Sequence, residues 1–479
     1  MTTSPPPSPP PTDRDLWNHA DFLRLWAAQA ISAFGSRITR TALPIIAVAT
    51  LDQPEAVIGV LAAMQLAPGV ILAMLAGGFV DRSRKRRILI AADLIRAALV
   101  ASLTVAWGLG LLSMIHVVVV GAGVGAASAL FQITDVAYLP TLIGRRRLVE
   151  GNAKLETTEA VAEITGPASA GVLIAALGAP LAVVIDAASY VWSAVMLGRI
   201  RTADRTDPIA PAAGVSASPA ARAIASSDVS SAPAGSSSPP VPPVAEEPDD
   251  AGAAQSFRTG EDFRIGLRAI FGHPLVRPIV LTLMVWSIAG GFFMALYTPY
   301  CLRELQLSKA TFGVIIAMGG VGSLGGAILS RTLARVLGVG RTLIATSALS
   351  LLCTLLIPIA GNFTSPAMKI GFLAAHQLLG DGFAVAFIIL AVTLRQTVLP
   401  RTVLGRANAA VHVCTSGVLP ITAVLAGGLA AVIGIHAAVW TGFLIGLAAP
   451  IFVWRLRHLQ AMPAGEGTAS DSALTRADA

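Results

Sequence analysis

Charged and aromatic residues are both scarce in this chain of 479 residues. Asp, Glu, Lys and Arg together make up 13% of the chain and aromatic residues 6%, whereas hydrophobic residues make up 54%. A typical soluble domain carries about 25% charged residues, so a string of ordinary soluble domains is excluded. The composition instead favours a chain whose main solvent is the lipid bilayer.

Cysteine is also rare, and the three cysteines are Cys301, Cys353 and Cys414. Their number is odd, they lie within apolar segments and they lack the spacing of metal ligands. A disulfide framework and a zinc site are therefore not indicated, and we expect neither a metal nor a cofactor. The net charge of +7 is spread over short clusters between apolar runs, which argues against a nucleic-acid partner.

Apolar runs of about 20 residues, the length that crosses a bilayer as a helix, recur along almost the whole sequence. They predict an all-α integral membrane protein with twelve transmembrane helices in two six-helix halves, 22–198 and 278–455. The spans are predicted at 23–48, 56–80, 88–109, 114–139, 153–177 and 180–197, and at 279–301, 310–330, 343–359, 370–394, 409–433 and 437–454.

Four segments lie outside these spans. Segments 1–21 and 456–479 are polar or Pro-rich and are predicted to be disordered cytoplasmic tails. Segment 199–256 is rich in Ala, Ser and Pro and is predicted to be a disordered cytoplasmic linker. In 257–277 apolar and basic residues separate onto two sides at helical spacing, which predicts an amphipathic helix at the membrane interface.

The basic residues fall in every second connection between spans, which predicts that those connections and both termini are cytoplasmic. Arg303 and Lys309 break this pattern once. Lysine is rare beside abundant Arg, Ala, Gly and Pro, which is typical of a GC-rich bacterial genome, so we expect a bacterial inner membrane. The basic clusters are Arg82 with Arg84–Arg87, Arg145–Arg147, Arg199 with Arg201, Arg331–Arg341, Arg401 with Arg406, and Arg455 with Arg457.

An internal repeat supports the division into halves. Arg87-Ile-Leu-Ile-Ala91 opens the third span, and Arg341-Thr-Leu-Ile-Ala345 opens the ninth. Gly178 and Gly434 end the fifth and eleventh spans, and they are separated by nearly the same number of residues as Arg87 and Arg341. Two homologous halves with a binding cavity near the midplane between them form a transporter architecture, because rocking the halves exposes the cavity to each side in turn.

The connection Gly77-Gly-Phe-Val-Asp81-Arg82-Ser-Arg-Lys-Arg86-Arg87 resembles the cytoplasmic signature loop of the major facilitator superfamily. It departs from the usual loop by placing Arg84 where a Gly is expected. A degenerate copy, Gly326-Ala-Ile-Leu-Ser330-Arg331, follows in the second half. With the carboxylates and arginine near the same ends of the spans, the resemblance implies a cytoplasmic gate of Gly77, Asp81, Arg82, Arg86, Asp93, Arg96, Asp135 and Arg331, although packing is an alternative role for Asp93, Arg96 and Asp135.

Phe22-Leu-Arg-Leu-Trp26, Ala92-Asp93-Leu-Ile-Arg96 and Gly166-Pro167 with Gly171 resemble the branch that contains enterobactin exporters and macrolide efflux proteins. This resemblance implies efflux of a small hydrophobic or amphipathic molecule, such as a drug, siderophore or secondary metabolite, driven by protons. The expected partners are that small molecule, protons and the bilayer, and the expected state is a monomer. An importer of the same fold and a non-transporting membrane sensor are the alternatives. No Ser/His/Asp constellation favours an enzyme.

Ionisable residues within spans are costly to insert, so they are candidates for proton coupling. Glu159 and Glu163 are four residues apart and share one face of the fifth span. Asp381 lies midway along the tenth span. A carboxyl group there could exchange a proton as the halves alternate. The alternatives are that the glutamates face cytoplasmic water or pair with gate arginines, and that Asp381 is hydrogen-bonded to a loosened backbone.

Arg37 and Arg40 lie deep in the first span and need counter-ions. They could bind an anionic substrate, hold Glu163 charged or form a fixed ion pair between helices. Further cavity candidates are polar or aromatic side chains, whose alternative roles are hydrogen bonding between helices and packing against lipid. They are Gln29, Gln65, Gln132, Phe34, Trp286 and Gln377.

Overall fold

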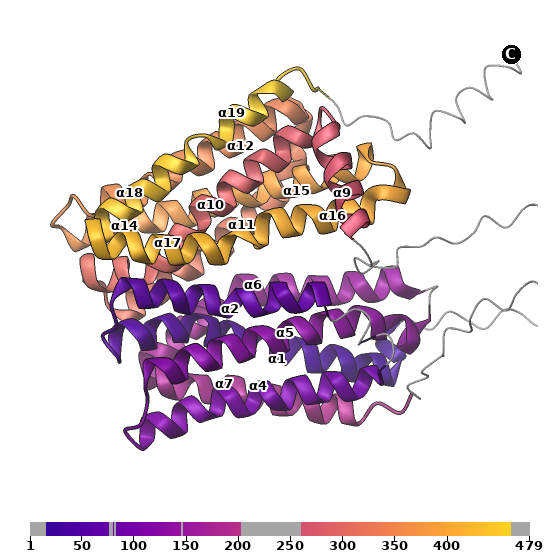
Figure 1. The fold of residues 1–479 in the computed structure, drawn as a ribbon, viewed down its shortest axis with the longest axis vertical. Coiled ribbons are helices and arrows are strands. Elements are labelled where there is room, and N and C mark those ends of the chain that lie inside the picture. The colour runs from indigo at the N-terminus through magenta and orange to yellow at the C-terminus, as the bar shows by residue number, and fades with distance from the viewer. Residues whose placement is uncertain (1–15, 76–79, 81–82, 145–146, 203–259, 461–479) are drawn as a thin grey trace, which may run out of the picture.

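A computed structural model describes residues 16–75, 80, 83–144, 147–202 and 260–460 (Figure 1). The described residues form helices, turns and short connections, with no strand among them. The predicted tails and linker lie mostly outside this part of the chain, as do the gate candidates Gly77, Asp81 and Arg82.

The first half consists of six long helices with short connections. They are α1 (Ala20–Ala49), α2 (Glu55–Leu75), α4 (Lys85–Gly108), α5 (Met114–Ile143), α6 (Leu148–Leu177) and α7 (Ala179–Gly198), preceded by the short η1 (Leu16–Asn18). α1, α2 and α5 each contain a proline, Pro44, Pro68 and Pro140, and each continues past it.

The second half also makes six passes, but most of them are built from two or three helical pieces. The passes are α10 (Val276–Pro299) with η4 (Tyr300–Glu304); α11 (Lys309–Leu337); α12 (Val339–Thr354) with α13 (Leu356–Ala360); α14 (Pro366–Ala375) with η5 (His376–Gly380) and α15 (Asp381–Val398); α16 (Arg401–Ser416) with α17 (Val418–Ile433); and α18 (Ile435–Gly446) with α19 (Ala449–Val453) and η6 (Trp454–Leu456).

The prediction of twelve spans in two halves is therefore confirmed. Ten spans are long and apolar enough to cross a membrane by length and composition, and α1 and α6 complete the first half. The predicted spans begin late where a helix starts with polar residues: the eleventh was predicted from 409, whereas α16 begins at Arg401. Polar residues at the bilayer surface can remain helical, so such helices extend beyond the apolar run.

Three helix breaks in the second half lie shortly before prolines in the sequence. Leu355, Gly417 and Leu447 separate helical pieces, and Pro358, Pro420 and Pro450 lie three residues after them. A proline has no N–H for the carbonyl four residues earlier and its ring crowds that carbonyl, which favours an interruption just before it, although α1, α2 and α5 continue past theirs. Two π-helical segments, η4 and η5, add further irregularity to this half.

The two ends of the helix bundle differ in charge and in packing. We call the end that holds Lys85–Arg87 and Arg199 the arginine-rich end, and the end that holds the connections at 50–54 and 434 the arginine-poor end. At the arginine-poor end a single hydrophobic core contains side chains from both halves, among them Ile46 and Phe312. At the arginine-rich end the buried clusters belong to one half each. Figure 1 shows the halves meeting on one side and diverging toward the other.

Glycines make the contact between the halves close at the arginine-poor end. On α6, a Cβ at Gly171 would overlap the backbone of Gly313 on α11. On α2, a Cβ at Gly59 would lie 2.5 Å from the carbonyl oxygen of Ala423 and 3.1 Å from the Cα of Gly427 on α17. Only a residue without a Cβ permits such backbone approach, which is the usual packing device of membrane helices.

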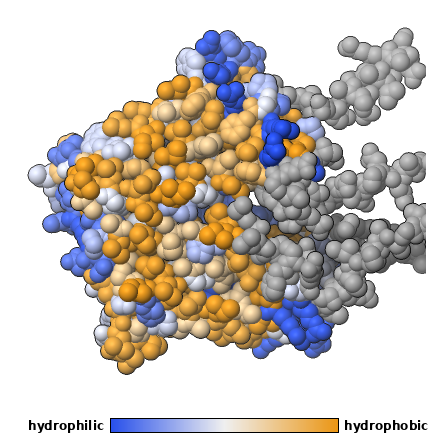
Figure 2. Space-filling model, in the orientation of Figure 1, coloured by the Kyte–Doolittle hydropathy of each residue, from blue (hydrophilic) through white to orange (hydrophobic). Residues whose placement is uncertain are grey.

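The outer surface is largely apolar. In Figure 2 a broad hydrophobic area covers the middle of the visible face, with hydrophilic residues gathered toward its ends. Exposed large apolar side chains such as Val105, Ile115 and Val432 would be unfavourable in water, whereas contact with lipid is favourable for them. The surface therefore agrees with an integral membrane protein.

The predicted amphipathic segment forms α9 (Gly260–Gly272). Its Ile270 is buried and packs in a cluster with Val411 of α16. A Cβ at Gly266 would overlap the backbone of Arg406, so α9 lies close against α16. The apolar side of α9 is therefore covered by the second half itself.

Candidate functional site

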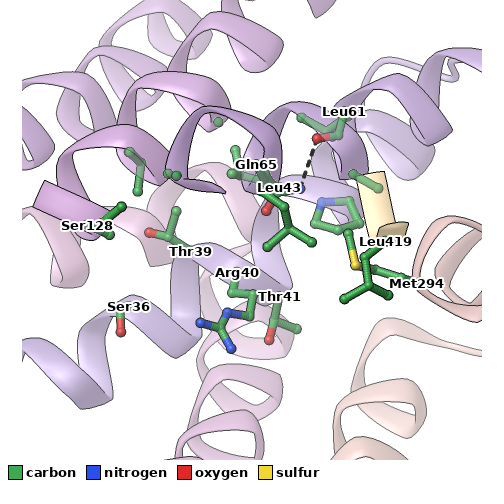
Figure 3. A pocket seen from close by; sticks show the side chains of 18 of the residues that line it. Ser36, Thr39, Arg40, Thr41, Leu43, Leu61, Gln65, Ser128, Met294 and Leu419 are labelled. Atoms are coloured by element: carbon green, nitrogen blue, oxygen red, sulfur yellow. Dashed lines mark hydrogen bonds between the residues drawn. The ribbon is translucent and has the colours of Figure 1, made fainter. Parts of the chain in front are cut away.

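A cavity of about 680 Å³ lies between the two halves. Its first-half wall comes from α1, α2, α5 and α7, and its second-half wall from α10, α11, α16 and α17. Both walls combine polar and apolar side chains: the first-half wall includes Thr39, Gln65 and Leu43, and the second-half wall includes His412 and Ser416 together with Phe293, Met294 and Leu419 (Figure 3). The cavity ends where the halves close at the arginine-poor end.

Arg40 is a charged residue in this cavity wall, and no Asp or Glu is among the residues that line it. Its guanidinium group forms no hydrogen bond or ion pair with the described residues, and Figure 3 shows the side chain between Thr39 and Thr41 with no dashed line to it. His412 of α16 also lines the cavity, and its ring pairs with Ser416 at 3.2 Å.

Arg37 lies one turn earlier on α1 and faces α6. Its Nη2 atom forms ion pairs with Glu159 and with Glu163, the latter at 2.5 Å. The arginine side chain is 5% exposed, whereas those of Glu159 and Glu163 are 53% and 58% exposed. A buried cation therefore holds two carboxylates that remain accessible on their other side.

The contact between α1 and α6 depends on a small residue. A Cβ at Gly166 of α6 would lie 2.5 Å from the Cγ of Arg37, so the arginine stem lies directly on the α6 backbone. The Nε of Arg37 is buried without a hydrogen-bond partner. The two ion pairs must therefore offset the free-energy cost of burying the Arg37 charge, because the Nε atom gains no hydrogen bond.

Asp381 begins α15, directly after the π-helical segment η5. It forms no hydrogen bond or ion pair among the residues that the structure describes. A Cβ at Gly319 of α11 would overlap the Asp381 carboxylate and lie 2.9 Å from Gln377 Nε2, so this glycine makes room for both side chains. The nearby His376 has a buried Nδ1 atom without a partner. The Asp381 carboxyl group is thus unpaired among the described residues, unlike those of Glu159 and Glu163.

A second buried ion pair lies within the first half. Asp93 and Arg96 pair on α4, and the Arg96 guanidinium lies 4.6 Å from the ring centre of Phe131 and 4.4 Å from that of Tyr190. Stacking between two rings satisfies a charge that has left water. Tyr190 also lines the cavity, so this cluster supports the cavity wall from behind.

Two further carboxylates of the first half accept hydrogen bonds from neutral groups. Gln29 Nε2 donates to Asp135 at 2.6 Å, joining α1 to α5. Asp186 on α7 accepts from the Thr39 hydroxyl and, at 3.0 Å, from the Ser189 hydroxyl. These bonds tie α1 to its neighbours on both sides.

The predicted gate residues do not form one cluster in this structure. Asp93, Arg96 and Asp135 make the contacts just described inside the first half. Arg86 donates to the carbonyl oxygens of Leu197, at 2.8 Å, and of Gly198, where the end of α7 offers unpaired acceptors. Arg331 is exposed on α11. None of these described contacts joins the two halves.

The predicted cavity residues divide into two groups. Arg40, Gln65 and Gln132 line the cavity. The others face elsewhere: Arg37 pairs with α6, Gln29 binds Asp135, Gln377 is buried beside Gly319, Trp286 packs on Phe387 at a ring distance of 4.8 Å, and Phe34 is not in the wall.

Sequence reasoning did not assign a role to Arg303. Its guanidinium donates to Glu55 at 3.0 Å, to Asp52 at 2.7 Å and to the Val48 carbonyl at 3.3 Å, all in the first half. It therefore bridges the halves at the arginine-poor end. Arg303 departs from the charge pattern of the connections, and this departure could have marked it as a candidate. Its partners lie some 250 residues earlier in the chain, so the sequence does not indicate them.

Two six-helix bundles that share a core at one end and enclose a cavity define the fold of a membrane transporter of the alternating-access type. Residues 25–398 match the Major Facilitator Superfamily, and the chain belongs to this family. It is a multi-pass membrane transporter by family and fold. A search of proteins with curated functions found no match.

Solved transporters with the same fold share little sequence with this chain. A bacterial homologue of the iron transporter ferroportin in an inward-facing state matches with 15% identity and a TM-score of 0.64, covering 91% of this chain and 98% of its own. A bacterial homologue of the human lysosomal transporter Spinster matches with 14% identity and a TM-score of 0.59, covering 92% and 98%. The nucleoside transporter NupG matches with 10% identity and a TM-score of 0.62, covering 92% and 99%.

The resemblance to enterobactin exporters and macrolide efflux proteins is not among these findings, so the branch within the family stays a prediction. Among the described residues no group of three or more His, Cys, Asp or Glu could hold a metal ion.

Proposed function

We propose that this transporter exports a small hydrophobic or amphipathic molecule, such as a drug, siderophore or secondary metabolite, by proton-coupled alternating access. The observation that carries the proposal is the position of Glu159 and Glu163 on α6. The same helix pairs with Arg37 of α1 in its middle and contacts α11 of the other half through Gly171. α6 thus joins a protonatable group to the surface on which the halves move.

The accessible sides of the two glutamates allow proton exchange. When Glu163 takes up a proton from water, its carboxyl group becomes neutral and its ion pair with Arg37 is lost. Arg37 is then held by Glu159 alone, and the attraction between α1 and α6 weakens. Because the Gly166 and Gly171 contacts leave α6 little freedom to adjust locally, a change at Glu163 favours movement of the helix as a unit.

Asp381 is the proposed carrier in the second half. It has no described hydrogen bond or ion pair that a change of protonation would break. Its position after a π-helical turn, against Gly319 of α11, places it where the second half departs from regular helix. π-turns of this kind are frequent at functional sites.

The cavity suits a cargo of drug-like size. A volume of about 680 Å³ falls within the range of about 300–1,000 Å³ that is usual for small-molecule sites. It is lined by both polar and apolar side chains, which favours an amphipathic cargo. If the arginine-rich end is cytoplasmic, as the charge pattern predicts, the separated ends of the halves face the compartment from which an exporter loads.

The test is proton movement in sealed liposomes on addition of a panel of lipophilic drugs and siderophores. Wild-type protein should give compound-dependent proton movement, and Glu163→Gln or Asp381→Asn should abolish it. Glu304→Gln is the matched control, because Glu304 is exposed on η4 and has no described hydrogen bond. Its proton movement should equal that of wild type.

Each contrary result points to a different error. Proton movement that survives both substitutions would exclude these carboxylates as carriers. Compound flux without any proton movement would retain transport and exclude proton coupling. Correctly inserted wild-type protein that moves neither compounds nor protons would contradict the export proposal.

A further inference from the structure

The charge in the cavity wall indicates which amphipathic molecules fit. Arg40 contributes a positive charge to the wall, and none of the lining residues is Asp or Glu. The nearest interacting carboxylates, Glu159 and Glu163, are bound to Arg37 and are not among the lining residues. The two arginines and two glutamates together are neutral, but the end of this group that faces the cavity is positive.

The Arg40 side chain is exposed in the cavity wall and has no described ion pair, so its guanidinium group is available to a ligand. Two polar neighbours of Arg40 are bound to backbone groups instead. Thr41 donates its hydroxyl to the Arg37 carbonyl, at 2.9 Å, and Gln65 donates its amide to the Leu61 carbonyl, at 3.5 Å. Arginine is a bidentate donor that matches carboxylate and sulfonate oxygens, so an anion is the group that would satisfy it.

The wall opposite this charge contains an apolar group of side chains. Phe293, Met294 and Leu419 line it from α10 and α17, and Figure 3 shows Met294 and Leu419 on the other side of the cavity from Ser36 and Thr39. A ligand with an anionic group at one end and an apolar body at the other can meet both walls at once.

We propose that the cavity binds monoanionic amphipathic molecules, with the anionic group held by Arg40 and the apolar body against Phe293, Met294 and Leu419. This inference rests on the proposed export function and narrows its cargo. An anion that leaves the cell moves down an inside-negative membrane potential, as does a proton that enters, so both movements of the exchange are driven in the same direction.

The test is equilibrium binding of three dansyl probes that share one apolar body. Dansylglycine is anionic, dansylglycinamide is neutral and dansylcadaverine is cationic. Fluorescence titrations use the full chain in nanodiscs of phosphatidylcholine. We expect wild-type protein to bind dansylglycine at least about tenfold more tightly than dansylglycinamide, because a charge-assisted hydrogen bond is worth that much, and to bind dansylcadaverine most weakly.

Three variants assign the preference to Arg40. Arg40→Gln should lose the preference for dansylglycine, while Arg40→Lys, which keeps the charge, should retain most of it. Lys309→Gln removes a positive charge at the start of α11, outside the cavity lining, and should bind as wild type does. Retention by Arg40→Lys and Lys309→Gln shows that the loss in Arg40→Gln does not come from misfolding or from net charge.

Equal affinities for the three probes, tightest binding of the cation, no binding of any probe, or a preference that survives Arg40→Gln would each overturn the proposal. Nanodiscs that contain phosphatidylglycerol separate two sources of the anion. Displacement of dansylglycine by this lipid would identify a lipid headgroup as the natural ligand, and no displacement would identify a water-soluble molecule. Because binding is measured without a gradient, these failures leave the proton-coupling test unaffected.

Discussion

The two halves share a fold but differ in how they place polar groups. In the first half, Arg37 pairs with Glu159 and Glu163, and Arg96 pairs with Asp93, whereas the buried Asp186 accepts hydrogen bonds from hydroxyl groups and Arg40 has no described ion pair. The second half has few charges inside, with Asp381 unpaired among the described residues and Arg395 donating to the neutral amide oxygen of Asn408 at 2.9 Å. It has instead the interrupted helices.

This difference indicates two ways of building a moving part. The ion pairs of Arg37 with Glu159 and Glu163 join α1 to α6, and the hydrogen bond of Thr39 with Asp186 joins α1 to α7. Without the two carboxylates, Arg37 would be an unpaired buried charge. Interrupted helices bend at their breaks, where hydrogen bonds are already absent. We interpret the first half as the one whose geometry responds to charge and the second as the one that deforms. The predictions that follow test this contrast, beginning with the largest expected effect.

The double variant Glu159→Gln with Glu163→Gln should be strongly destabilised. It leaves Arg37 buried without a counter-ion, and breaking a buried pair from one side costs about 3 kcal/mol or more. Each single variant keeps one carboxylate and should lose about 1 kcal/mol or less. The free energy of unfolding, measured by denaturant titration in mixed micelles, should therefore fall more in the double variant than the two single losses together.

Additive losses in that experiment would mean that the glutamates do not share Arg37. Adding Arg37→Leu to the double variant is a matched control, because it removes the buried charge itself. It should recover part of the lost stability, although the leucine leaves some of the arginine's volume unfilled.

In the second half, Asp381→Asn should raise the free energy of unfolding, whereas the glutamate substitutions of the first half should lower it. Replacing this half-buried, unpaired carboxylate by a neutral amide removes a desolvation cost, so the free energy of unfolding should rise by about 1 kcal/mol while proton-coupled flux is lost. The same denaturant titration measures the first quantity and the liposome assay the second. A loss of stability would show that Asp381 has a partner that stabilises its charge.

Replacing a proline should change the transport rate in the second half but not in the first. Pro420→Ala restores a helical N–H near the break at Gly417, which should straighten α16 and α17, stabilise the fold by about 1 kcal/mol and slow transport. Pro68→Ala, in the uninterrupted α2, is the control and should leave the transport rate nearly unchanged. Equal effects on the initial rate of flux would remove the distinction between the halves.

The smallest effect is expected at the arginine-poor end. Arg303 bridges the halves, but Asp52 is 94% exposed, so Arg303→Gln should weaken closure by only about 0.5–1 kcal/mol. Spin labels at Pro54→Cys and Gln306→Cys, in a background without the native cysteines, should show a larger population at long distance. Lys309→Gln removes a charge from the same end without a described ion pair and should leave the distance distribution unchanged.

The sequence predicted the spans better than it predicted the site. The twelve spans follow from apolar runs. The breaks at 355, 417 and 447 lie three residues before Pro358, Pro420 and Pro450, but α1, α2 and α5 continue past their prolines, so proline alone does not predict the breaks. Of the predicted cavity residues, Arg40, Gln65 and Gln132 lie in the wall. Gln29 and Trp286 do not, because hydropathy has no strong periodicity in helices that meet lipid on one side and apolar neighbours on the other.

The sequence by itself determined the solvent of this protein, its class and its division into halves, because apolar run length and repeated motifs are properties of the chain alone. Only the tertiary structure decided which charges pair. Arg37 and Arg40 are one turn apart and were equivalent as sequence, yet one faces Glu159 and Glu163 and the other faces the cavity. Their roles depend on how α1 is rotated against α6, and that rotation is set by close packing at Gly166 and by contacts between residues more than 100 positions apart.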